Sequence, residues 1–124
     1  MGDVARCVYD VLWRATEVGI EAAKPGARAC DLFHVMSRVM SEFSQDGGDI
    51  GRLGHGLGMQ LTEQPSVADF DETVLEENMV LTLEPSLSYG AGLMMVHEEN
   101  IVVTASGCRL LTERASQDLP VLFA

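Results

Sequence analysis

The stretch Gly54-His55-Gly56-Leu57-Gly58, followed by Thr62-Glu63-Gln64-Pro65-Ser66, sets one histidine among glycines ahead of a predicted strand. Because glycine has no side chain, the backbone at His55 can approach another strand closely, and the imidazole can project without shielding from its neighbours. A metal ligand or a proton carrier needs that access. The alternative is a glycine-rich turn with a histidine that faces solvent, and this stretch alone does not decide between the two.

Two later stretches favour the metal site. Leu81-Thr82-Leu83-Glu84-Pro85 places the carboxylate of Glu84 at the end of an apolar run. His97-Glu98-Glu99-Asn100-Ile101-Val102-Val103-Thr104 places the carboxylate of Glu98 at the entrance of a β-branched run. Two carboxylates with one imidazole suit Mn²⁺, Fe²⁺, Co²⁺ or Zn²⁺, so the three stretches together predict a divalent metal centre.

The hydrophobic periodicity predicts an α+β fold. Apolar residues recur at intervals of three and four over 4–23, which predicts a helix ended by Pro25-Gly26. A second helix is predicted from near Cys30-Asp31 to a stop at Gly47-Gly48. After Gly51 the pattern becomes strand-like, and the predicted strands cover 57–62, 79–83, 93–104 and 108–111, with turns at 89–92 and 105–107. We expect a single domain over 1–124, with two helices packed on a curved, mostly antiparallel sheet.

Composition limits the partners and the compartment. Acidic residues outnumber basic ones 19 to 8, so the surface repels phosphate backbones and nucleic-acid binding is not expected. The hydrophobic share of 47% is high enough to suggest apolar area meant for another domain or subunit. The three cysteines are odd in number and lack a C-x-x-C spacing, the N-terminus does not read as a signal peptide, and no apolar run is long enough for a membrane span. These features indicate the cytoplasm, without membrane attachment.

In their order and spacing the three stretches resemble the pita-bread metallohydrolases, the family of methionine aminopeptidase, prolidase (Xaa-Pro dipeptidase), aminopeptidase P and creatinase. The resemblance runs from about residue 8 to residue 112. It implies half of a pita-bread fold, namely the C-terminal half of the catalytic domain. It also implies metallopeptidase or amidohydrolase chemistry on a small-molecule or short-peptide substrate.

The resemblance assigns a role to each candidate ligand. It implies that His55 is a terminal imidazole ligand, that Glu84 is a terminal carboxylate and general base, and that Glu98 bridges two metals. The family also uses two aspartates from an earlier hairpin. Asp3 and Asp10 do not match them and are better explained as a helix cap and an exposed helix residue. With an incomplete site this chain is expected to hold one metal ion or none, and to be inactive without an upstream half.

Thr62 marks a departure from the family. Peptidases of the family carry a second histidine seven residues after the first, where it contacts the substrate, and this sequence has Thr62 there. A hydroxyl can donate a hydrogen bond but cannot carry a proton near neutral pH. The substitution favours creatinase-like hydrolysis of non-peptide C–N bonds, or an amide or dipeptide hydrolase. A second hypothesis is a peptide- or protein-binding module of the same fold that has lost catalysis.

The remaining polar residues are given structural roles. His97 precedes Glu98, so in a strand its ring points to the opposite face, where it is exposed or supports the site. Glu99 is expected to be solvated, His34 to lie on the surface and Trp13 to pack beside the first helix. Either a homodimer or an upstream half would cover the sheet.

Overall fold

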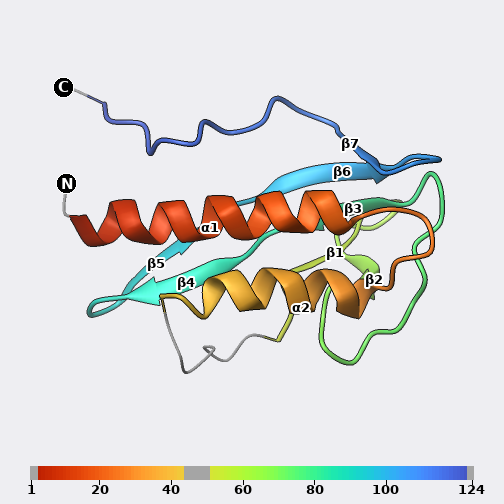
Figure 1. Ribbon diagram of the computed structural model, residues 1–124, viewed down its shortest axis with the longest axis horizontal. Coiled ribbons are helices and arrows are strands. Elements are labelled where there is room, and N and C mark those ends of the chain that lie inside the picture. The colour runs from red at the N-terminus through yellow and green to blue at the C-terminus, as the bar shows by residue number, and fades with distance from the viewer. Residues whose placement is uncertain (1–2, 44–50, 123–124) are drawn as a thin grey trace.

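The two helices form one layer and the strands a second (Figure 1). The computed structural model describes residues 3–43 and 51–122. Its elements are α1 (Asp3–Ala22), α2 (Ala29–Met40), β1 (Gly54–Gly56), β2 (Glu63–Ser66), β3 (Val80–Leu83), β4 (Ser86–Tyr89), β5 (Leu93–Val96), β6 (Glu99–Val103) and β7 (Cys108–Leu110). The predicted α+β class, with helices on a mostly antiparallel sheet, is confirmed.

The helices follow the predicted apolar stripes. α1 ends just before Pro25, and α2 begins with the Asp31 carboxylate accepting a hydrogen bond from the Arg28 N–H at 2.9 Å. Their buried faces meet the inner side chains of β3 and β6 in one hydrophobic core, whose members include Val8, Leu12, Ala15, Leu32, Met36, Met40, Leu81, Leu83, Ile101 and Val103. The end of α2 at Met40 comes earlier than predicted, and the predicted stop at Gly47-Gly48 lies outside the described residues.

The main sheet is antiparallel with the strand order β2-β1-β3-β6-β7, and β4 and β5 form a separate two-stranded sheet. Both sheets share one register, because Leu83 pairs with Glu99 and Ser86 pairs with Val96. They are therefore one long hairpin, interrupted where Glu84-Pro85 lies opposite His97-Glu98. The His97 N–H donates to the Pro85 carbonyl at 3.0 Å, but proline has no N–H to return the bond.

Two strand predictions are wrong. The strand is Gly54–Gly56 itself, and residues 57–62 form a loop in which Met59 and Leu61 are almost fully exposed. Pairing with β3 decides this, since a Cβ on Gly54 would lie 2.0 Å from the Thr82 carbonyl oxygen and only glycine permits the approach. The predicted strand 93–104 is divided between β5 and β6. Both predicted turns, at 89–92 and 105–107, lie in hairpins.

The helices cover one face of the main sheet, and the opposite face, called here the bare face, has no helix packed on it among the described residues. The helices pack on the side that carries the buried leucine, isoleucine and valine residues of β3 and β6.

In the described ranges, no helix has the length and apolar character needed to cross a membrane.

Candidate metal centre

Strand alternation brings the three predicted ligands together on the bare face. Leu81 and Leu83 point into the core, so Thr82 and Glu84 point away from it. On the opposite strand, Glu98 and Asn100 alternate in the same way with the buried residues of β6. His55 lies across from Thr82 in the register of β1 and β3. These side chains line a cavity of about 420 Å³, together with Leu57, Leu61 and Thr62.

The geometry of His55 suits a metal ligand. Its ring is buried, and its Nδ1 lies 3.0 Å from the Gly56 carbonyl oxygen, which can only accept a hydrogen bond. This contact assigns the proton to Nδ1 and leaves the lone pair on Nε2. Nε2 faces Glu84 Oε1 at 3.2 Å. A hydrogen bond from the other ring nitrogen to a carbonyl is the usual way in which proteins orient a metal-binding histidine.

The two carboxyl groups are held against each other. The hydrogen bond with Glu84, followed by burial and the negative charge of Glu84, raises the pKa of Glu98 above its ordinary value. Two adjacent carboxyl groups ionise together only with difficulty, so one retains a proton unless a cation neutralises the pair. The pair therefore provides a negative centre beside an imidazole lone pair.

Further acceptors converge on the same cavity. Thr82 Oγ1 and Asn100 Oδ1 are buried, and neither has a hydrogen-bond partner among the described residues. Buried polar atoms are normally paired, so two orphans in one cavity call for a ligand or solvent at that place. Oxygen atoms around one imidazole nitrogen are a ligand set that fits a divalent cation.

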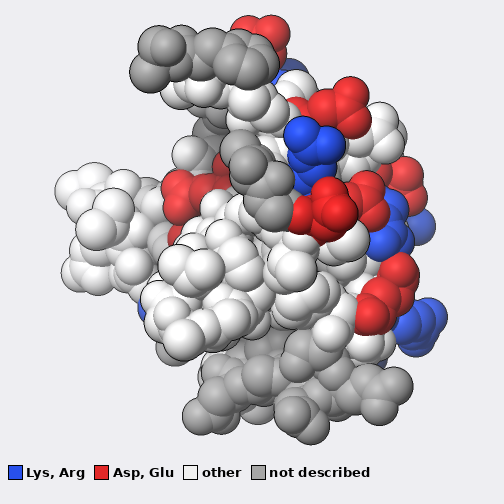
Figure 2. Space-filling model, turned by 90° about the vertical axis from the view of Figure 1, so that its left-hand side faces the viewer, with Lys and Arg blue, Asp and Glu red and all other residues white. Residues whose placement is uncertain are grey.

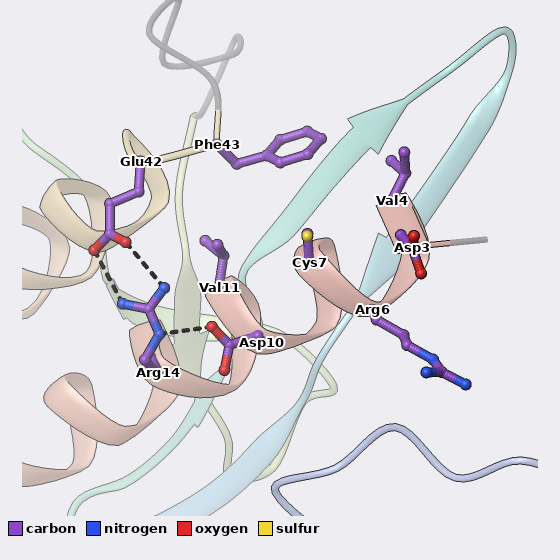
Figure 3. Close-up of a pocket in the computed structure, with 9 residues that line it drawn as sticks. All are labelled: Asp3, Val4, Arg6, Cys7, Asp10, Val11, Arg14, Glu42 and Phe43. Carbon is purple, nitrogen blue, oxygen red and sulfur yellow. Dashed lines mark hydrogen bonds and ion pairs between the residues drawn. The ribbon is translucent and has the colours of Figure 1, made fainter. Parts of the chain in front are cut away.

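The three candidate ligands do not already form a metal-binding cluster among the described residues. Within residues 3–43 and 51–122, no group of three His, Cys, Asp or Glu side chains lies close enough together to hold a metal ion. Asp3 and Asp10 line a different cavity, of about 640 Å³, between the start of α1 and the end of α2 (Figure 3). There the Asp10 carboxylate accepts from Arg14 at 2.9 Å, and Arg14 also reaches Glu42. Neither aspartate contributes to the candidate centre, as the sequence predicts.

The covered face holds a polar cluster that the sequence prediction missed. Glu99 is not solvated as expected, because its side chain is only 3% exposed and accepts a hydrogen bond from Arg114 at 2.9 Å. Burial opposes ionisation of Glu99, but hydrogen bonds from the Ala115 N–H, Arg114 and His97 outweigh it and hold the pKa of Glu99 below its ordinary value. His97 is also buried, on the face opposite Glu98 as predicted, and burial lowers its pKa.

Two other side chains have the surroundings that the sequence predicted. His34 is exposed and its Nε2 lies 2.8 Å from Asp69 Oδ1. Trp13 is partly buried, and its indole N–H donates to the Ala115 carbonyl at 3.0 Å. The role of Arg114, whose guanidinium lies 4.2 Å from the Trp13 ring centre, had no signal in the sequence, because a lone arginine near a chain end is most often exposed.

Comparison with known proteins supports the same assignment of fold. The sequence model of metallopeptidase family M24 matches residues 2–105. The Xaa-Pro dipeptidase of Pyrococcus furiosus is 36% identical over 109 residues, which are 87% of this chain and 31% of that protein. The Xaa-Pro dipeptidase of Lactobacillus delbrueckii subsp. lactis is 37% identical over 121 residues, 97% of this chain and 32% of that protein.

The solved structure of the Pyrococcus furiosus prolidase superposes on this fold with a TM-score of 0.86 at 31% identity. The match covers 93% of this chain and 34% of the prolidase chain. The chain thus spans about a third of the length of the relatives that it matches.

Proposed function

Because the chain belongs to metallopeptidase family M24, we propose that its bare sheet face is part of the metal centre of a hydrolase that cleaves an amide-like C–N bond. The observation that carries the proposal is the convergence of two carboxyl groups and one imidazole nitrogen on a single cavity. His55 Nε2 faces Glu84 Oε1 at 3.2 Å, and Glu98 lies against Glu84. Such an arrangement is stable only with a shared proton or a cation.

In this proposal His55, Glu84 and Glu98 hold a divalent ion such as Mn²⁺, Co²⁺, Fe²⁺ or Zn²⁺. A bound ion of this kind acidifies water and polarises an amide carbonyl. Glu84, a partly exposed carboxylate at the cavity, is placed to accept a proton as general base. Thr62, exposed at the cavity rim, can donate one hydrogen bond to the substrate. Leu57, which is partly buried, provides an apolar wall beside the reacting groups.

A short peptide is the substrate class that we propose. Two relatives with 36% and 37% identity are Xaa-Pro dipeptidases, which favours the dipeptide branch among the C–N hydrolases that the Thr62 substitution leaves open. These names give no support to a module that only binds protein. Two further carboxylates from an upstream part of a longer molecule would complete the centre. A homodimer of this chain would cover the sheet but would duplicate the same three ligands.

We also infer that the protein works in a reducing compartment such as the cytoplasm. Cys7, Cys30 and Cys108 are all free thiols in the structure. Secreted domains of this size commonly pair their cysteines.

Metal stoichiometry tests the proposal. After equilibration with Mn²⁺ or Zn²⁺ and desalting, elemental analysis should find about one ion per chain, held as His55, Glu84 and Glu98 close around it. His55→Ala should lose the ion. His34→Gln is the matched control, because it removes an exposed imidazole that pairs only with Asp69. An unoccupied wild-type protein, or equal loss in both variants, would contradict a metal centre at His55.

Activity provides a second measurement. We expect the chain alone to leave an Xaa-Pro dipeptide intact in Mn²⁺, because the described residues place only three of the candidate ligands at the cavity. Hydrolysis by the wild-type chain that disappears in Glu84→Gln would support the hydrolase assignment, and would show that the three ligands suffice.

A further inference from the structure

We propose that the buried Glu99–Arg114 pair on the covered face is a positioning device that fixes the metal-facing Glu98 on the bare face. This inference rests on the function proposed above. Glu98 is the residue between His97 and Glu99, and strand alternation directs both neighbours into the covered side while Glu98 faces the cavity. Fixing the two neighbours therefore fixes the direction of the ligand between them.

The Glu99 carboxylate is held by three groups at once. Its Oε2 lies 2.9 Å from Arg114 Nη1, 3.0 Å from the Ala115 N–H and 3.1 Å from His97 Nε2. The side chain of Glu99 is 3% exposed and that of Arg114 is 17% exposed. A charge-assisted hydrogen bond in such surroundings is directional and poorly screened by water. It therefore restricts the orientation of the backbone at Glu99.

Arg114 is itself anchored to α1. Its Nη2 donates to the Trp13 carbonyl at 3.0 Å, and its guanidinium stacks 4.2 Å from the Trp13 ring centre. Trp13 returns a bond from its indole N–H to the Ala115 carbonyl, and the Tyr9 hydroxyl donates to the Ser116 carbonyl. These contacts fix the segment after β7 against α1, and the same segment bonds Glu99 through Arg114 and Ala115. In Figure 1 this segment runs alongside α1.

His97 carries the restraint to the second carboxylate segment. Its N–H donates to the Pro85 carbonyl at 3.0 Å, next to Glu84. The pairing of β3 with β6 and the pairing of β4 with β5 both stop at this point. The bond between His97 and Pro85 links the two chain segments across that interruption. The spacing of Glu84 and Glu98 thus depends on how firmly His97 and Glu99 are seated.

A purely structural role is the competing explanation. Buried ion pairs are weak contributors to stability, and apolar pairs of similar volume often replace them without loss. Stability alone therefore does not require Glu99 and Arg114. This difference separates the two roles experimentally, because an apolar pair can fill the space but cannot fix the orientation of the strand.

The test compares Glu99→Met/Arg114→Met with the wild type. Urea unfolding should give a similar midpoint for both, whereas Arg114→Met alone should unfold earlier because it strands the Glu99 charge. In the double variant, calorimetric Mn²⁺ affinity should fall 10- to 100-fold, as for other residues that orient metal ligands. Hydrogen exchange at the His97 amide of the metal-free protein should become at least about tenfold faster.

Arg14→Met is the control, because Arg14 lies on α1 next to Trp13 and bonds Asp10 and Glu42 away from the candidate site. It should leave affinity and exchange unchanged. If the methionine pair does not fold, Glu99→Leu/Arg114→Met provides a second apolar pair that cannot hydrogen bond, and the same predictions apply to it. A folded double variant with wild-type exchange at His97 would overturn the inference. Failure of the wild type to bind Mn²⁺ would instead overturn the proposed function, and the exchange result would still decide the positioning role.

Discussion

Glu98 shows how a candidate metal ligand can weaken the fold when no metal is bound. Its pKa is raised chiefly through the hydrogen bond with Glu84, and burial and repulsion from Glu84 add to this, so ionising Glu98 beside Glu84 costs stability. We predict that Glu98→Gln raises the melting temperature of the metal-free protein at pH 7 by a few degrees, because it removes this repulsion. Mn²⁺ uptake should be lost in the same variant. A lower melting temperature in the absence of metal would contradict this account.

Asp71 has a structural role in the loop after β2. It accepts hydrogen bonds from the Ser66 N–H at 2.7 Å and the Thr73 N–H at 2.9 Å. Burial opposes its ionisation, but these bonds outweigh burial and lower the pKa of Asp71 below 3.8. We predict that Asp71→Asn costs about 1–2 kcal/mol of unfolding free energy at pH 7.

The pH dependence checks the cause. A carboxylate with a lowered pKa in the folded state stabilises fully above its unfolded pKa of 3.8, and the stabilisation is lost as pH falls through the folded value. The difference between Asp71→Asn and the wild type should therefore shrink below about pH 3.8, as measured by urea unfolding. The exposed control Glu77→Gln should show no comparable difference at pH 7. A constant difference across this range would point to a packing effect.

At the scale of elements, β1 depends on the absence of a side chain. A Cβ on Gly54 would meet the Thr82 carbonyl of β3, whereas a Cβ on Gly107 would have no neighbour within 4 Å. We predict that Gly54→Ala destabilises the protein by about 1–3 kcal/mol or more, as overpacking does. It should also weaken Mn²⁺ binding, because His55 is the next residue. Gly107→Ala should change stability by no more than about 0.5 kcal/mol. Equal effects on urea midpoints would contradict the close approach of β1 and β3.

For the whole molecule, charge is the dominant long-range term. The net charge is −11, and the end view in Figure 2 shows acidic side chains interspersed with arginine and lysine on one side. Raising NaCl from roughly 10 mM to 150 mM shortens the Debye length from about 30 Å to 8 Å, which should raise the melting temperature by a few degrees. Glu76→Lys/Glu77→Lys changes the net charge by +4, two units per substitution, and should reduce this salt dependence. A melting temperature that falls with NaCl would contradict net self-repulsion.

Sequence and structure agree most closely where local chemistry decides. The apolar stripes of both helices, the turns at 89–92 and 105–107 and the three candidate ligands could all be read from residue types and spacing. The strand at 54–56 could not, because two glycines give no strand propensity and one of its two partners, β3, lies more than twenty residues away. The division of 93–104 depended on Pro85, a residue of the opposite strand.

The sequence by itself determined which residues are candidate ligands, because an imidazole between glycines and two glutamates at strand ends are side chains that suit divalent metals. Only the tertiary structure decided how they meet. One shared hairpin register places Glu84 opposite Glu98, and the pairing of β1 with β3 brings His55 across from Thr82. It also decided the role of Glu99, since the arginine that makes its burial tolerable lies fifteen residues further along the chain, and only folding brings charge and countercharge together.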